Sequence, residues 1–92
     1  MIVTFSSKDT EIIWIGKRVK SIPNEIQEIG RRKLRMLNNS QSLIDLKVPQ
    51  SNRLEKLLNM NNFYSIRIND KWRITFKWEQ NNAYEVTIID YH

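Results

Sequence analysis

Hydrophobic and polar residues alternate along the last third of the chain in the pattern of β-strands. Residues 64–68, 72–78 and 84–88 each carry apolar side chains at every second position. The segments between them, residues 69–71 and 80–82, are built from Asn, Asp, Gln and Lys, which favour turns after a strand. This part of the chain therefore predicts a three-stranded antiparallel meander with one apolar face.

The first half of the chain follows the period of an α-helix instead. Ser7 is a predicted N-cap of a short helix that ends near Gly16. Pro23 begins a longer helix that runs to about Leu37. The apolar stripe of this second helix consists of Ile26, Ile29, Gly30, Leu34, Met36 and Leu37. Its other side carries Arg31, Arg32 and Arg35. Lys33 lies within the stripe, where either its stem covers the edge of the core or its ammonium group has a function.

The remaining segments complete the prediction of an α+β fold. Residues 2–5 are expected to form a first strand, residues 42–46 one more helical turn, and residues 49–52 a loop. Residues 53–58 fit a strand or a short turn equally well. We therefore expect a single domain over residues 1–92, with an N-terminal strand, two or three helices, and then an antiparallel β-meander packed on the helices.

Composition limits the classes of protein to which the chain can belong. It has 92 residues, 40% of them hydrophobic, which is enough for one small core. It has no cysteine, so disulfides, thiol catalysis and thiolate metal sites are excluded. No apolar run approaches the length of a membrane span, and the first six residues do not resemble a signal peptide. We expect a cytoplasmic protein without membrane association.

The charge of the chain points to an anionic partner. Lys and Arg number 15 against 10 Asp and Glu, for a net charge of +5. Alternation along the predicted strands places Arg67, Arg73 and Lys77 together on the outward face of the meander. Such a face suits the phosphate backbone of a nucleic acid. The alternative is a solvated basic face that serves only solubility.

The candidate chemistry gathers around the end of the last predicted strand. Asp90, Tyr91 and His92 follow that strand, and His92 is the only histidine. Metal-assisted hydrolysis is not expected, because ligand-spaced His, Cys and carboxylate groups are missing from the sequence. Cleavage of RNA through its own 2′-hydroxyl needs a base, an acid and a cation at the phosphate, which these three residues and Arg73 supply. The alternative is that the final histidine has no function.

Two blocks of sequence resemble a known protein family. They are Tyr64–Trp78, which contains Ser-Ile-Arg-Ile-Asn-Asp-Lys-Trp-Arg-Ile, and Val86–His92, which ends in Asp-Tyr-His. Together they resemble the HigB-type killer toxins of the RelE/ParE superfamily. Residues 2–7, 32–37 and 52–55 also fit that family, so the resemblance extends over essentially the whole chain.

The resemblance implies a function, a set of partners and a set of site residues. It implies the toxin of a type II toxin–antitoxin pair. Such a toxin would be a ribosome-dependent, metal-independent endoribonuclease that needs no cofactor. It would cut mRNA in the A site of the 70S ribosome, in contact with 16S rRNA. Its partner would be a helix-turn-helix antitoxin of the HigA type, which neutralises it and links it to operator DNA. Arg73 matches the family's phosphate-contacting arginine. Asp90, Tyr91 and His92 match its C-terminal catalytic cluster.

The sequence departs from the family pattern just before the meander. Family members often carry a histidine and a catalytic lysine there, whereas this chain has Leu57 or Leu58 where the lysine would fall. Lys56 or Arg53 is a candidate substitute as an RNA-binding residue. Two other functions stay open: a non-enzymatic inhibitor of a protein such as DNA gyrase, as ParE-type relatives are, and a nucleic-acid-binding module without a reaction.

Overall fold

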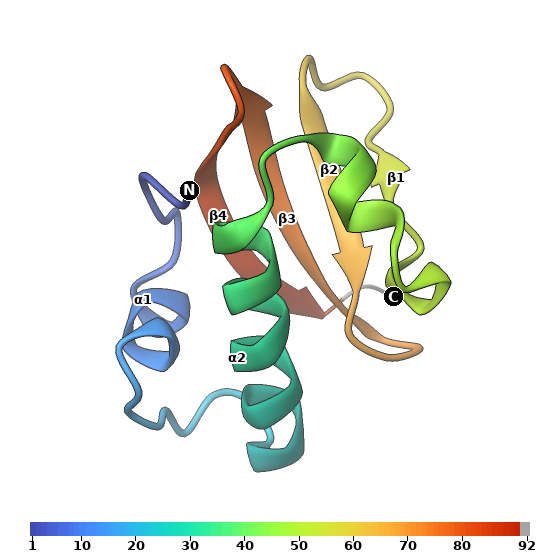
Figure 1. Cartoon of the computed structure of the whole chain (residues 1–92). Helices are drawn as coiled ribbons and strands as arrows, with labels where there is room; N and C mark the ends of the chain where they lie inside the picture. Colours follow the sequence, from blue (N-terminus) through green and yellow to red (C-terminus); the bar gives the residue numbers. More distant parts are fainter. Residues whose placement is uncertain (91–92) are drawn as a thin grey trace.

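The computed structural model describes residues 1–90 and confirms the α+β prediction. The elements in chain order are α1 (Lys8–Trp14), α2 (Asn24–Asn39), η1 (Leu43–Lys47), η2 (Gln50–Asn52), β1 (Glu55–Lys56), β2 (Phe63–Arg67), β3 (Trp72–Glu79) and β4 (Asn82–Asp90). The strands form one antiparallel sheet in the order β1-β2-β3-β4, and α1 and α2 lie against one of its faces (Figure 1). Among residues 1–90, no helix is long and apolar enough to span a membrane.

The predicted meander of β2, β3 and β4 is confirmed, and β1 adds a fourth strand at its edge. Glu55 pairs with Ser65 of β2, and Lys56 pairs with Tyr64. The segment that fitted a strand or a turn therefore contains a strand of two residues. Periodicity could not identify so short a strand, because alternation needs several residues to become visible.

The prediction of a regular first strand over residues 2–5 is wrong. This segment instead forms two isolated parallel bridges to β4, at Ile2 and at Phe5. The register between β3 and β4 shifts opposite this segment, and Glu85 has a φ of 52°. A bulge of this kind interrupts a regular ladder, so the N-terminal segment pairs with β4 only on either side of it.

Both predicted helices are confirmed, and α2 extends two residues past the expected end. The Ser7 hydroxyl accepts a hydrogen bond of 3.2 Å from the Thr10 amide at the start of α1. Gly30 lets α2 approach the sheet closely, since a Cβ at this position would lie 3.0 Å from Ile88 Cδ1. The buried core between helices and sheet includes Ile13, Ile26, Leu34, Leu37, Leu46, Ile66, Ile74, Phe76, Val86 and Ile88. Residues 50–52, expected as loop, form the short helix η2.

The side chains of α2 also fix the segment that joins it to α1. Gln27 is buried, donates to the carbonyls of Val19 at 2.8 Å and Ile22 at 2.5 Å, and accepts from the Val19 amide at 3.0 Å. Arg31 was predicted on the solvent side, but its guanidinium donates to the carbonyls of Ile13 at 2.9 Å and Lys17 at 3.2 Å. Arg31 therefore links α2 to the end of α1 and to the segment that follows it.

Candidate active site on the outer face of the sheet

The strand register defines one face of the sheet that the helices do not cover. On this outer face, Arg67 pairs with Arg73, and Arg73 pairs with Ile89 of β4. Lys77 lies on the same face, two residues along β3 from Thr75. The prediction that Arg67, Arg73 and Lys77 share a face is confirmed. The face is not fully solvated, however, because Thr75 is only 8% exposed.

Arg73 is the most restrained cation of this face. Its Nε donates to Ser65 Oγ at 2.9 Å, and its Nη2 donates to the Arg53 carbonyl at 2.7 Å. The same Nη2 lies 3.7 Å from Glu55 Oε1, and only 12% of the Arg73 side chain is exposed. These contacts hold the guanidinium in one orientation, which is the condition for stabilising a negative charge without reorganisation.

The backbone conformation of Arg53 directs its carbonyl toward Arg73. Arg53 ends η2 in the left-handed region, with φ 44° and ψ 59°, where residues other than Gly, Asn and Asp are uncommon. Its amide donates to the Gln50 carbonyl at 3.0 Å while its own carbonyl accepts from Arg73. Arg53 thus takes part in the site through its carbonyl, whereas its side chain is exposed.

The outer face also contains a hollow of about 410 Å³ with a largely apolar wall. We call it the outer hollow, and it is lined by Ser6, Leu57, Met60, Phe63, Thr75, Glu85, Thr87 and Ile89. Ile89 is the register partner of Arg73, so the hollow and Arg73 share this face of the sheet, although Arg73 does not line the hollow. The apolar residues of the hollow are not among the site residues predicted from the sequence. Phe63 and Ile89, which are apolar although they lie at outward positions of their strands, are the signal that could have indicated them.

Two of the predicted RNA-binding cations are paired with acidic neighbours. Arg67 forms an ion pair with Asp70, and Lys77 Nζ lies 3.1 Å from Glu79 Oε1.

Lys56, the suggested substitute for the missing lysine, does not face the site. Its partner in the strand register is Tyr64, whose ring stacks on Phe76 of the core. Alternation therefore places Lys56 on the helix-covered side of the sheet, away from Arg73. Leu57, one residue later, faces the outer hollow instead.

The predicted C-terminal cluster begins at the same end of the sheet as Arg73. Asp90 pairs with Trp72, directly after the pair of Ile89 with Arg73. Alternation places Asp90 on the opposite face from Arg73, so the register by itself does not bring these two side chains together. Tyr91 and His92 lie outside the described residues.

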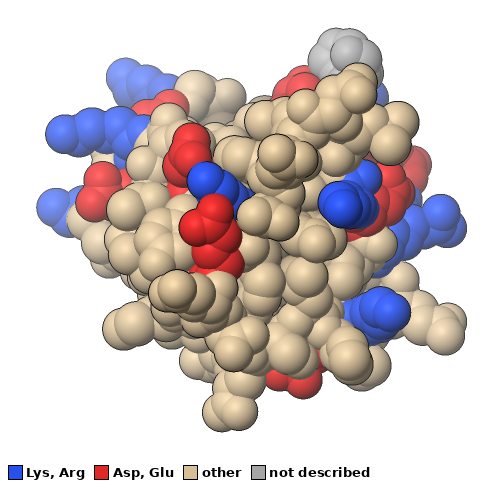
Figure 2. Space-filling view, turned by 90° about the horizontal axis from the view of Figure 1, so that it is seen from above, with Lys and Arg blue, Asp and Glu red and all other residues tan. Residues whose placement is uncertain are grey.

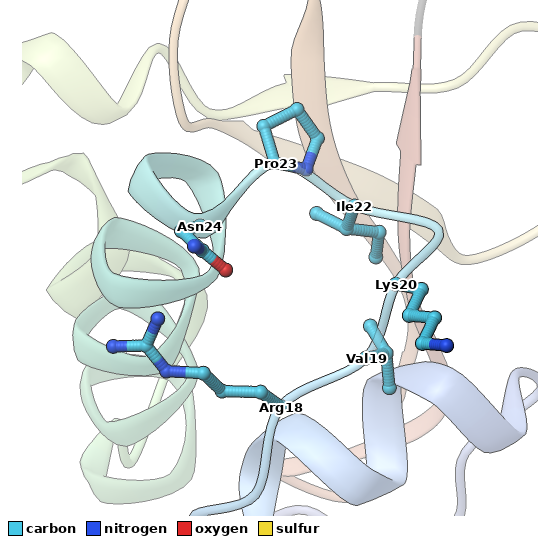
Figure 3. A pocket seen from close by; sticks show the side chains of 6 residues that line it. All are labelled: Arg18, Val19, Lys20, Ile22, Pro23 and Asn24. Atoms are coloured by element: carbon cyan, nitrogen blue, oxygen red, sulfur yellow. The ribbon is translucent and has the colours of Figure 1, made fainter.

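A second hollow lies at the segment between α1 and α2, and it does not assemble a cation cluster. It is lined by residues 18–20 and 22–24. Figure 3 shows the Lys20 ammonium directed away from the hollow and Arg18 extended toward α2, where its Nη2 lies 3.6 Å from Glu28 Oε1. Figure 2 likewise shows Lys and Arg in separate groups with acidic side chains among them. On the face that this view shows, the positive charge is therefore not gathered into one patch.

Comparisons with known proteins identify the family of this chain. Residues 8–92 match the profile of the HigB-like toxins, described as the RelE-like toxin of type II toxin-antitoxin system HigB. The chain is 38% identical over 77 residues to Toxin HigB-1 of Vibrio cholerae serotype O1, covering 83% of this chain and 80% of that protein. It is 37% identical over 69 residues to an uncharacterized protein of Haemophilus influenzae, covering 74% and 68% respectively. The chain therefore belongs to the HigB-like toxin family and is a RelE-like toxin of a type II toxin–antitoxin system, with an antitoxin as its partner.

Proposed function

We propose that this toxin is a metal-independent, ribosome-dependent endoribonuclease that cuts mRNA in the A site and so stops translation and growth. The observation that carries the proposal is Arg73, whose side chain is nearly buried and whose guanidinium is held by Ser65 and the Arg53 carbonyl on the same face as the outer hollow. A fixed guanidinium on the same face as an apolar hollow suits RNA, with a phosphate on the cation and a base against the apolar wall.

The proposed reaction uses the 2′-hydroxyl of the RNA as nucleophile. A base removes its proton, the 2′-oxygen bonds to the adjacent phosphorus, and the bond from phosphorus to the 5′-oxygen breaks. An acid protonates that leaving oxygen, so the products are a 2′,3′-cyclic phosphate and a 5′-hydroxyl. Arg73 stabilises the charge of the pentavalent phosphate, a contribution of roughly 10²–10³ in rate for a preorganised donor.

The base and the acid come from the C-terminal cluster in this proposal. Asp90 is the last residue of β4, Tyr91 and His92 follow it in the sequence, and the preceding residue Ile89 pairs with Arg73. Histidine and carboxylate groups are the usual proton carriers near neutral pH, and Tyr91 can stack on a base. Leu57 or Leu58 stands where the family's lysine would fall, and Leu57 lines the outer hollow, so in this proposal the C-terminal residues supply both proton transfers.

The proposed partners follow from the same function. The antitoxin is of the helix-turn-helix, HigA type, and the toxin reaches operator DNA only through it. The toxin acts in the cytoplasm on mRNA bound to the 70S ribosome, in contact with 16S rRNA. The net charge of +5 supports this assignment, because basic residues attract the phosphates of ribosomal RNA.

The test is to induce the toxin in growing cells and to map mRNA 5′ ends by primer extension. We expect cuts at codon positions within translated messages, and we expect Arg73→Ala and His92→Gln each to abolish them. Lys47→Ala is the matched control, because Lys47 is an exposed cation of η1 and lies outside the proposed site. Cuts that persist in Arg73→Ala would contradict the proposal.

The same cultures separate the nuclease from a ParE-like inhibitor of DNA gyrase. Inhibition of gyrase changes plasmid supercoiling while mRNA stays intact. Altered supercoiling without new mRNA ends would therefore contradict the nuclease proposal and favour an inhibitor of gyrase. Unchanged supercoiling with new mRNA ends would support the nuclease proposal.

A further inference from the structure

The three groups that hold Arg73 differ in charge and in geometry. Ser65 and the Arg53 carbonyl are neutral and lie at hydrogen-bonding distances of 2.9 and 2.7 Å. Glu55 is the charged one, and its Oε1 lies 3.7 Å from Nη2, which is within ion-pair range but too long for a hydrogen bond. The neutral groups therefore orient the guanidinium, while Glu55 compensates its charge.

The exposure of the two charged partners is unequal. The Arg73 side chain is 12% exposed, whereas the Glu55 side chain is 62% exposed. A carboxylate that is mostly in water can leave the pair at little cost, because exposed ion pairs are weak and screened. An anion that reaches Arg73 from the outer face can then replace it through shorter, charge-assisted hydrogen bonds.

The fold places Glu55 where an anionic ligand of Arg73 would meet it. Glu55 pairs with Ser65, so it lies on the outer face, and β1 is the edge strand of the sheet. Arg73 extends from β3 across Ser65 of β2 to reach this edge. The hydrogen bond from Arg73 to Ser65 does not involve Glu55, so we expect Arg73 to keep its orientation when its charge partner changes.

We propose that Glu55 is a positioning residue that occupies Arg73 in the free toxin and is displaced by a phosphate group of the RNA. This inference rests on the proposed function to the extent that it takes Arg73 as the phosphate contact. It predicts that Glu55 weakens substrate binding and has little effect on the rate once substrate is bound, because the phosphate has by then replaced it.

The test measures binding of a short single-stranded 2′-O-methyl RNA, which the toxin cannot cleave through a 2′-hydroxyl, to the purified full chain at low salt. Glu55→Gln is expected to bind about two- to fivefold more tightly than the wild type, the range for loss of an exposed ion-pair competitor. The gain is expected to vanish in the Arg73→Ala background. Glu28→Gln is the matched control, since it also removes an exposed carboxylate from an ion pair, 3.6 Å from Arg18.

Each outcome supports or overturns the proposal. Tighter binding in Glu55→Gln that needs Arg73 supports it. An equal gain in Glu28→Gln, an equal gain in the Arg73→Ala background, or no tighter binding at all overturns it, since Glu55 then acts through net charge or only supports the fold. In ribosome-dependent cleavage, a lower KM with an unchanged kcat for Glu55→Gln supports it further, and a lower kcat with an unchanged KM contradicts it.

The two proposals fail separately. If the toxin does not cut mRNA but the effect of Glu55→Gln on oligonucleotide binding still depends on Arg73, the nuclease proposal is wrong and the proposed role of Glu55 stands. If the toxin cuts mRNA through Arg73 but Glu55→Gln has no effect that depends on Arg73, the nuclease proposal stands and the proposed role of Glu55 is wrong.

Discussion

At the scale of single residues, Asn52 joins η2 to α2 and to the segment around η1. Asn52 is fully buried, and its amide nitrogen donates to the Leu46 carbonyl at 3.1 Å and contacts Met36 Sδ at 3.0 Å. Its Oδ1 accepts from Lys33 Nζ. Lys33 is half-buried, so its stem covers the core edge as one of the two interpretations expected, and its ammonium also satisfies a buried acceptor. Because Arg53 follows Asn52, this anchor also fixes the carbonyl that meets Arg73.

Replacing Asn52 by Ala is expected to destabilise the toxin. The change removes the groups that satisfy the Leu46 carbonyl and Lys33, and leaving buried polar groups unsatisfied costs about 1–3 kcal/mol. Urea unfolding followed by circular dichroism measures the free energy of unfolding. Asn61→Ala, at an exposed position of the loop before β2, is the control and is expected to stay within about 0.5 kcal/mol of the wild type. Equal stability of both variants would show that Asn52 does not anchor η2.

The environment of Lys33 makes the free energy of unfolding depend on pH, and the direction of this dependence can be stated. Burial lowers the pKa of Lys33 from its ordinary value of 10.5, and the nearby positive charge of Arg32 lowers it further. Between the lowered pKa and 10.5, the unfolded chain binds more protons at Lys33 than the folded chain, so stability rises with pH across this interval. At lower pH the penalty of a buried charge is fully present.

The measurement compares the wild type with Lys33→Met at neutral pH and near pH 10. The difference in unfolding free energy, wild type minus variant, is expected to increase toward the higher pH, because only the wild type loses the penalty of the buried charge. Lys47→Met, at an exposed position of η1, is expected to show no such increase. A difference for Lys33→Met that stays constant with pH would refute this origin of the pH dependence.

At the scale of elements, α2 lies close to the sheet at Gly30. A Cβ at Gly30 would lie 3.0 Å from Ile88 Cδ1 and 3.5 Å from Ile68 Cδ1, so a larger side chain must displace these side chains or α2 itself. Gly30→Val is expected to cost about 1–3 kcal/mol of stability through overpacking. Arg35→Val on the exposed side of α2 carries the same β-branched helix penalty without the contact, and thermal unfolding of both variants separates the two effects. Equal melting temperatures would mean that the helix has room to adjust.

The same elements show what a sequence can predict. The helices and the three long strands could be predicted because their periodicity and their caps, such as Ser7, are local. The shared face of Arg67 and Arg73 also followed from alternation alone. The contact of Arg73 with Glu55 could not be predicted, because it depends on the register of a strand of two residues. The bridges from residues 2–5 to β4 join parts of the chain about eighty residues apart, for which a single sequence carries no signal.

At the scale of the whole molecule, the basic side chains come from several elements and are partly compensated by ion pairs. The pairs Arg18 with Glu28, Arg67 with Asp70 and Lys77 with Glu79 involve five separate elements or connecting segments. The net charge of +5 nevertheless remains and creates a field that extends beyond single contacts. Arg73 is different, since its charge is nearly buried and acts at short range. In the proposed nuclease, exposed cations therefore attract the toxin to ribosomal RNA, whereas Arg73 acts on the scissile phosphate.

Under this proposal, a variant with Lys20, Arg32 and Arg35 changed to Gln is expected to bind ribosomes more weakly and with a smaller dependence on salt. These three cations are exposed, and each contact with an RNA phosphate contributes roughly one unit to the slope of log affinity against log salt. Cosedimentation with ribosomes between about 50 and 200 mM salt measures that slope. Arg73→Ala is expected to keep nearly the wild-type slope but to lose mRNA cleavage even at saturating toxin. If the triple variant kept the full slope, or if saturating Arg73→Ala cut normally, attraction and chemistry would not be divided between these two sets of residues.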